Sequence, residues 1–158
     1  MRIALVNPIS RSGEGYHTAN GTVPQLGLQV LAQLTPSEHQ VELIDESFGS
    51  DDTGRLLRQG NYDLVGLTAY TSSATRAYEI AAICREYGIP TIMGGAHATA
   101  VPDEAAGYVD SVAVGECDAI WPQIVADAAA GHLAARYDGQ LADLAGGRMD
   151  LPGAADAT

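Results

Sequence analysis

Lysine is absent from this chain of 158 residues, so all 8 of its basic residues are arginines. Without lysine the chain cannot form a Schiff base, build a Gly-Lys-Ser/Thr phosphate loop, or supply the lysine of a phosphate-switch receiver domain. Acidic residues number 20, and the formal net charge is -12. Because such a surface repels phosphate backbones and anionic lipids, we expect neither nucleic acid nor a membrane surface as a partner.

Cysteine is scarce, and long apolar runs are missing. Cys84 and Cys117 are the two cysteines, and they stand in no metal-ligand spacing. This predicts two free thiols in a reducing compartment and no zinc or iron-sulfur site made by this chain alone. No apolar run reaches the roughly 18 residues of a membrane span, and the segment before Pro8 is too short for a secretory signal. We therefore expect a cytoplasmic protein.

What the sequence does contain is a regular alternation of apolar strands and amphipathic helices. Apolar residues at helical spacing follow each of the first three expected strands. A further helix is expected to end at Ala128 and to begin at Asp118, which we predict as its cap. The pattern predicts an α/β fold with a doubly wound, five-stranded parallel sheet, flavodoxin-like or Rossmann-like. The expected strands are Arg2–Val6, His39–Asp45, Asp63–Thr68, Thr91–Met93 and Asp110–Gly115.

The domain boundary is predicted from a change in composition. Residues 1–133 carry the strand and helix pattern, whereas residues 134–158 are rich in alanine, glycine and aspartate. We interpret 134–158 as an edge segment, with one further edge strand at Ala135–Asp138, followed by a tail or linker.

The unusual residues of the sequence all follow the carboxyl ends of predicted strands. They are the long polar loop Asn7–Val23, the hydroxyl cluster Thr71–Ser73, the run Gly94–His97, and Gly115 with Glu116. In doubly wound sheets ligands bind at this edge, where the strand order reverses. Two consecutive glycines fit either a tight strand-to-helix connection or a backbone that lies against a flat ligand, and both interpretations stay open.

Three common kinds of α/β domain can be compared with the residues at this edge: those that bind a pyridine nucleotide, receiver domains, and those that bind a flavin. A pyridine nucleotide needs Gly-x-Gly-x-x-Gly opening the first helix, and that motif is missing. A receiver domain needs aspartates where Asn7 and Thr68 stand. A flavin needs a tight phosphate loop after the first strand, for which Ser10–Gly13 is a loose match. A flavodoxin-like sensory or interaction domain, binding a flavin or no cofactor, is the alternative that we retain.

A series of short segments, in order and with natural spacing over residues 1–133, resembles one family. The sequence is similar to the N-terminal cobalamin-binding domain of cobalamin-dependent radical SAM enzymes, the group of the magnesium-protoporphyrin monomethyl ester cyclase and many methyltransferases. The segments are Arg2–Pro8, Pro24–Leu28, Val41–Asp45, Asp63–Thr68, Gly94–Thr99 with Pro102, and Val114–Glu116.

The resemblance implies a cobalamin site with no catalytic residue on this chain. The nucleotide tail of the cofactor would lie against Gly94 and Gly95, with Ser72 or Ser73 bonding the dimethylbenzimidazole and Glu116 accepting from ribose hydroxyls. His97 would contact the tail or, alternatively, bond within the protein at a helix start. The full set of implied cofactor-binding residues is Asn7, Pro8, Pro24, Leu26, Gly27, Thr71, Ser72, Ser73, Gly94, Gly95, His97, Val114, Gly115 and Glu116.

The sequence also departs from the family in three places. The Asp-x-His-x-x-Gly motif that supplies a lower cobalt ligand is absent, and His17 is either a cobalt ligand or a solvated loop histidine. The family's Gly-Glu-Gly-Glu reads Gly115-Glu116-Cys117-Asp118 here. The Cys-x3-Cys-x2-Cys motif of the radical SAM cluster is missing. We therefore expect a module that binds cobalamin and catalyses nothing alone, whether natural or truncated, with a radical SAM domain or subunit as its partner.

Overall fold

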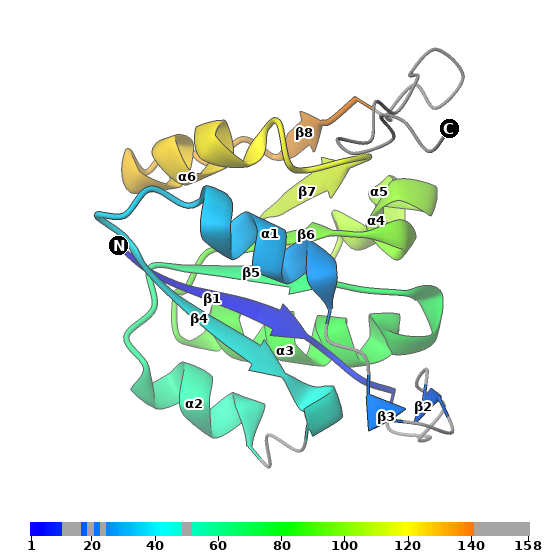
Figure 1. Cartoon of the computed structure of the whole chain (residues 1–158). Coiled ribbons are helices and arrows are strands. Elements are labelled where there is room, and N and C mark those ends of the chain that lie inside the picture. Colours follow the sequence, from blue (N-terminus) through cyan, green and yellow to red (C-terminus); the bar gives the residue numbers. More distant parts are fainter. Residues whose placement is uncertain (11–16, 19–20, 23–24, 49–51, 141–158) are drawn as a thin grey trace, which may run out of the picture.

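A computed structural model describes residues 1–10, 17–18, 21–22, 25–48 and 52–140. Its centre is one sheet in which all six strands run parallel, in the order β4-β1-β5-β6-β7-β8 (Figure 1). The α/β, doubly wound class is therefore confirmed. The strands are β1 (Arg2–Asn7), β4 (Gln40–Asp45), β5 (Leu64–Thr68), β6 (Thr91–Gly94), β7 (Ser111–Val114) and β8 (Arg136–Asp138).

The sixth strand corrects the predicted count of five. β8 pairs with β7 in parallel register, Val112 with Arg136 and Val114 with Asp138. Only Tyr137 of its three residues is buried, and its hydroxyl donates to Asp127 at 2.8 Å. Because three residues are too few to show a period of two, the sequence indicated this strand only as a further edge segment.

Helices cover both faces of the sheet. α1 (Leu26–Leu34) and α6 (Trp121–Ala129) lie on one face, where they pack on a core built around Ile3, Leu5 and Ile92. The other face carries the second core, which includes Ala77, Ile80 and Cys84 of α3. The helices of that second layer are α2 (Thr53–Gln59), α3 (Ala74–Glu86), α4 (Ala96–Ala100) and α5 (Pro102–Ala105) (Figure 1).

Short elements complete the carboxyl edge of the sheet. The 3-10 turns η1 (Glu46–Phe48) and η2 (Thr71–Ser73) follow β4 and β5, and the two-stranded ribbon β2 (His17–Thr18) and β3 (Gly21–Thr22) follows β1. β1 lies between β4 and β5, so the strand order reverses beside β1. This is where the topology rule for doubly wound sheets places a ligand.

One helix start differs from the sequence prediction. α6 begins at Trp121, with Ile120 at its N-cap and no side-chain capping bond, so the capping role predicted for Asp118 is wrong. The turn before it closes instead through the amide of Trp121, which donates to the carbonyl of Cys117 at 2.8 Å. At the start of α3, Ser73 occupies the N-cap, and its hydroxyl bonds Tyr70 rather than a helix amide.

Among the helices of the described residues, none combines the length and the apolar character that crossing a membrane requires.

Candidate cofactor-binding site

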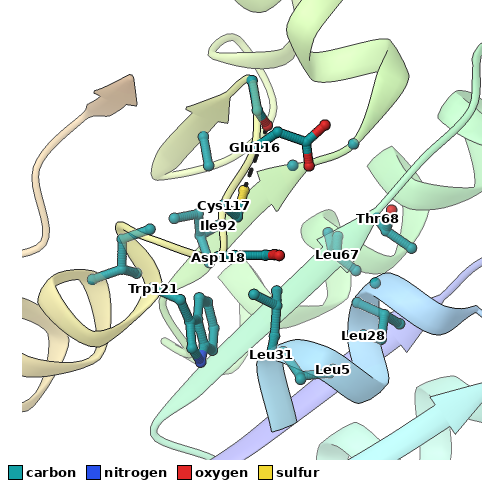
Figure 2. Close-up of a pocket in the computed structure, with 17 residues that line it drawn as sticks. Leu5, Leu28, Leu31, Leu67, Thr68, Ile92, Glu116, Cys117, Asp118 and Trp121 are labelled. Atoms are coloured by element: carbon teal, nitrogen blue, oxygen red, sulfur yellow. Dashed lines mark hydrogen bonds between the residues drawn. The ribbon is translucent and has the colours of Figure 1, made fainter. Parts of the chain in front are cut away.

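A pocket opens at the carboxyl ends of β1, β5, β6 and β7, between α1 and α6 (Figure 2). It encloses about 140 Å³. The residues that line it are apolar side chains and glycines in its interior, with a few polar side chains from the loops. They are Leu5, Gly27, Leu28, Leu31, Gly66, Leu67, Thr68, Ile92, Gly94, Gly95, Ala113, Gly115, Glu116, Cys117, Asp118, Trp121 and Ile124.

Glycines form the part of the wall nearest the strand ends. At Gly94 a Cβ atom would lie 3.3 Å from Sγ of Cys117, so the missing side chain keeps the gap between β6 and the loop after β7 open. Gly95 has φ +91° and is backed by Thr68, whose Oγ1 would lie 2.7 Å from a Cβ there. Both the space and the backbone conformation therefore require glycine at this point.

Gly115 shapes the next turn in the same way. Its φ is +79°, and a Cβ atom would lie 2.6 Å from the carbonyl oxygen of Gly139, just beyond β8. The amide of Gly115 donates to Oγ1 of Thr99 at 3.0 Å, which ties the loop after β7 to α4. The loop that carries Glu116 to Asp118 is thus fixed at its start by close backbone contacts.

Trp121 supplies the largest side chain of the pocket wall. Its side chain is 2% exposed, and its Nε1 donates to Oγ1 of Thr35 at 2.8 Å. Thr35 in turn donates to the carbonyl of Leu31 at 2.8 Å. These bonds lock the indole against the end of α1, and Figure 2 shows its nitrogen on the ring edge that points away from Cys117.

Apart from the indole of Trp121 and the hydroxyl of Thr68 at the end of β5, the polar side chains of the pocket lie in the loop after β7. Glu116 and Asp118 are exposed, whereas Cys117 is partly buried. Burial raises the pKa of the Cys117 thiol to about 11, and the neighbouring carboxylates of Asp118 and Glu116 add to this. The thiol is therefore protonated at neutral pH, and it points toward the carbonyl oxygen of Gly115 at 3.9 Å.

Five of the residues predicted from the sequence line this pocket: Gly27, Gly94, Gly95, Gly115 and Glu116. Three others lie nearby on the carboxyl edge or at the start of α1. The side-chain nitrogen Nδ2 of Asn7 donates to Oδ1 of Asp45 at 2.9 Å, Pro8 is buried, and Leu26 is 66% exposed. Pro24 lies outside the described residues.

The hydroxyl cluster and Val114 are not part of the pocket wall. Thr71 and Ser72 are exposed, while Ser73 is buried and its Oγ accepts from the amide of Tyr70 at 3.2 Å. Val114 packs against the core of the α3 layer, because successive side chains of β7 point to opposite faces. Ala113, its neighbour, is the residue of β7 that faces the pocket.

His97 lies in the α3 layer and is bonded within the protein. It is buried, with Nε2 at 2.7 Å from the Tyr78 hydroxyl and Nδ1 at 3.3 Å from Oγ1 of Thr71. Tyr78 also donates to Glu104 at 3.0 Å, and desolvation together with that carboxylate raises the pKa of Tyr78 to about 12. Both ring nitrogens of His97 thus have partners from this chain.

The candidate cobalt ligand His17 is described through its backbone alone. His17 begins β2 and pairs with Thr22 of β3, and its side chain is outside what the structure describes. Within the described residues, no group of three or more histidine, cysteine or acidic side chains is placed to hold a metal ion.

The sequence did not identify the apolar side chains of the pocket. Leu28, Leu31, Ile92 and Trp121 lie in segments predicted as helix or strand, where an apolar side chain that lines a pocket looks the same in the sequence as one that fills a core. One sequence signal was available: Cys117 and Asp118 directly follow Gly115 and Glu116, and both line the pocket.

Comparison with known proteins identifies this architecture. The family model described as "B12 binding domain" matches residues 16–125. The chain is 42% identical over 113 residues to the bacteriochlorophyllide d C-8(2)-methyltransferase of Chlorobaculum tepidum, a stretch that covers 72% of this chain and 24% of that protein. It is 30% identical over 135 residues to the C-12(1)-methyltransferase for the same compound in that organism, with 84% and 28% covered.

A third relative is an uncharacterized methyltransferase of Pyrococcus horikoshii, 32% identical over 133 residues, with 79% of this chain and 29% of that protein covered. The chain thus spans about a quarter of the length of these curated relatives. The family match and these identities agree with the resemblance found in the sequence. The chain belongs to the B12-binding domain family.

Proposed function

We propose that this chain is a cobalamin-binding module that presents the cofactor to a radical SAM catalytic domain or subunit. Family membership implies cobalamin as the ligand. The observation that carries the proposal is the pocket between α1 and α6, where glycines replace side chains at the carboxyl ends of β6 and β7. When bound, cobalamin supplies a cobalt centre that can carry a methyl group, and the named relatives are methyltransferases.

The residues present fit the flat, largely apolar base of the cofactor's nucleotide tail. In our proposal the backbone of Gly94 and Gly95 lies against the tail, and Leu31 and Trp121 contact the base from the helix side. The exposed carboxylate of Glu116 accepts hydrogen bonds from ribose hydroxyls. These roles follow from the lining of the pocket and from the missing Cβ atoms, which leave the room that a close approach requires.

The remainder of the cofactor would lie over the carboxyl edge of the sheet. Asn7, Leu26 and the exposed residues Thr71 and Ser72 lie at this edge or at the start of α1, and we propose that they face the corrin ring and its amide side chains. Pro8 is left out of this set because it is buried. His97 is left out of the set, because Tyr78 and Thr71 already bond its ring nitrogens.

The chemistry of methyl transfer is assigned to a partner. A radical SAM cluster needs three cysteines in Cys-x3-Cys-x2-Cys, and these 158 residues contain Cys84 and Cys117 alone. We propose that this chain binds and orients the cofactor and keeps water from the nucleotide tail, while the partner, as a domain or subunit, supplies the cluster and the substrate site.

Reconstitution tests the proposal directly. The purified chain is incubated with hydroxocobalamin, desalted, and its visible spectrum recorded; we expect a coloured protein fraction with close to one corrinoid per chain. A colourless protein would overturn the proposal. A parallel incubation with flavin mononucleotide serves as the control, and a yellow protein fraction would favour the flavodoxin-like alternative instead.

A further inference from the structure

The interior of the pocket offers few hydrogen-bonding groups. Its buried side chains are those of Leu5, Leu28, Leu67, Ile92, Ala113, Trp121 and Ile124, and the only polar atom among them is Nε1 of Trp121. That nitrogen already donates to Thr35. Thr68 and Cys117 add a hydroxyl and a thiol from partly buried residues of the wall. The carboxylates of Glu116 and Asp118 belong to exposed residues of the loop, at the mouth of the pocket.

The backbone of the pocket wall is also engaged. β5, β6 and β7 form a continuous parallel ladder in which Gly66 pairs with Ile92 and Ile92 with Ser111, so the backbone groups of the wall strands bond one another. At the strand ends the carbonyl of Gly94 accepts from the amide of Ala69 at 3.3 Å, and the amide of Gly115 donates to Thr99. A polar ligand atom that enters the interior therefore gives up water and gains few partners.

Corrinoid cofactors of this class carry different bases on the nucleotide tail, and the bases differ in how many polar edge atoms they expose. We propose that this pocket selects an alkylated benzimidazole and discriminates against a purine base such as adenine. The inference rests on the proposed function. The methyl groups of dimethylbenzimidazole suit contact with Leu31, Ile92 and Trp121. Adenine has more polar edge atoms than the Thr68 hydroxyl and the Cys117 thiol can pair, so most of them would be buried without a partner.

Three corrinoids separate this inference from the proposed function: cobalamin, the cobamide with adenine as its base, and cobinamide, which lacks the nucleotide tail. Trp121 is the only tryptophan of the chain and lines the pocket, so quenching of its fluorescence reports binding at this place. We expect the Kd of the adenine cobamide to exceed that of cobalamin about tenfold or more, and cobinamide to bind more weakly than cobalamin.

Each outcome decides one question. If no corrinoid binds, the proposed function itself fails. If cobalamin and the adenine cobamide bind equally, or the adenine form binds more tightly, the pocket does not select the base and the inference is overturned, while the proposed function stands.

A matched pair of variants tests whether polarity is the cause. Ala113 lines the pocket from β7, and Ala113→Ser adds a hydroxyl there, while Ala113→Cys adds a side chain of similar size that bonds weakly. We expect the serine variant alone to reduce the ratio of the two Kd values severalfold. A ratio that changes equally in both variants, or in neither, would contradict selection by polarity. The cooperative unfolding transition of each variant shows that its fold is retained.

Discussion

The indole nitrogen of Trp121 and the hydroxyl of Thr35 form a 2.8 Å hydrogen bond that joins the start of α6 to the end of α1. The two helices flank the pocket, so this bond holds its two sides together. Thr35→Val should lower the free energy of unfolding by about 1 to 2 kcal/mol, because a buried N–H loses its partner. Urea unfolding measures the change, with Thr35→Ser as the control that keeps the hydroxyl. Equal stabilities of the two variants would show that the bond contributes nothing.

Bulk at Gly94 should close the pocket. Gly94 does not have a positive φ, so Gly94→Leu tests space rather than backbone strain. We expect the affinity for cobalamin to fall at least about tenfold, since a side chain there would overlap Cys117 and the bound tail. Ala82→Leu, on the exposed side of α3 in the other layer, adds similar bulk as the control.

A rescue experiment addresses the concern that Gly94→Leu disturbs the fold. Gly94→Ala places a Cβ atom 3.3 Å from Sγ of Cys117, and adding Cys117→Gly removes that sulfur. The double variant should bind cobalamin more tightly than Gly94→Ala alone. Cobalamin retention that is unaffected in Gly94→Leu would remove Gly94 from the proposed site.

Acid should weaken the fold through Glu46. Burial opposes ionisation of this carboxyl, but hydrogen bonds from Arg76, Thr53 and Ile9 outweigh it and hold the pKa of Glu46 below its ordinary value of 4.5. Arg76 Nη2 lies 2.6 Å from Glu46 Oε1. Because the folded-state pKa is lowered, the stabilisation is fully present above about pH 4.5 and is lost as the pH falls through the folded-state value.

Glu46→Gln removes this charge and should lower the free energy of unfolding by roughly 2 kcal/mol at pH 7. The difference from the unsubstituted chain should shrink as the pH falls below 4.5, measured by urea unfolding across that range. Asp138→Asn, which breaks the exposed pair with Arg136, is the control and should change little. A difference independent of pH would rule out the charge of Glu46 as the cause.

Cys117 should react slowly with alkylating reagents. With its pKa at about 11 rather than 9.0, its thiolate fraction at pH 8 is on the order of a hundredfold below that of an ordinary thiol. Alkylation of the Cys84→Ala variant, followed by mass spectrometry, isolates Cys117. We expect the rate to rise with pH up to about 11, and bound cobalamin to slow it further because Cys117 lines the pocket. Unfolding in urea should restore the ordinary rate.

The sequence predicted the fold well where the local signal was strong. Continuous apolar runs such as Leu64–Thr68 gave the strands, and Gly94, Gly95, Gly115 and Glu116 were placed at the correct edge. The sequence could not show which face each residue takes. Val114 and Gly115 are neighbours, yet Val114 packs into the opposite core, and the pleat that separates them depends on a register that only the assembled sheet fixes.

The start of α6 shows a second limit. Asp118 has the chemistry of a capping residue, and the helix nevertheless begins three positions later, where Pro122 suits the first turn. Tertiary contacts of Trp121 with Thr35 compete there with the local capping preference. Local propensity alone therefore placed Asp118 at the cap of the helix, whereas the structure has it in the loop before the helix.

The pocket draws its wall from Leu5 near one end of the described chain to Ile124 near the other. During synthesis the strands β1, β5 and β6 precede the loop and helix that complete this wall, so a nascent chain that stops before Trp121 lacks one side of it. On the proposed function, corrinoid binding therefore requires a chain synthesised past Trp121, and the appearance of corrinoid binding on stalled ribosomes would mark the moment at which α6 joins the fold.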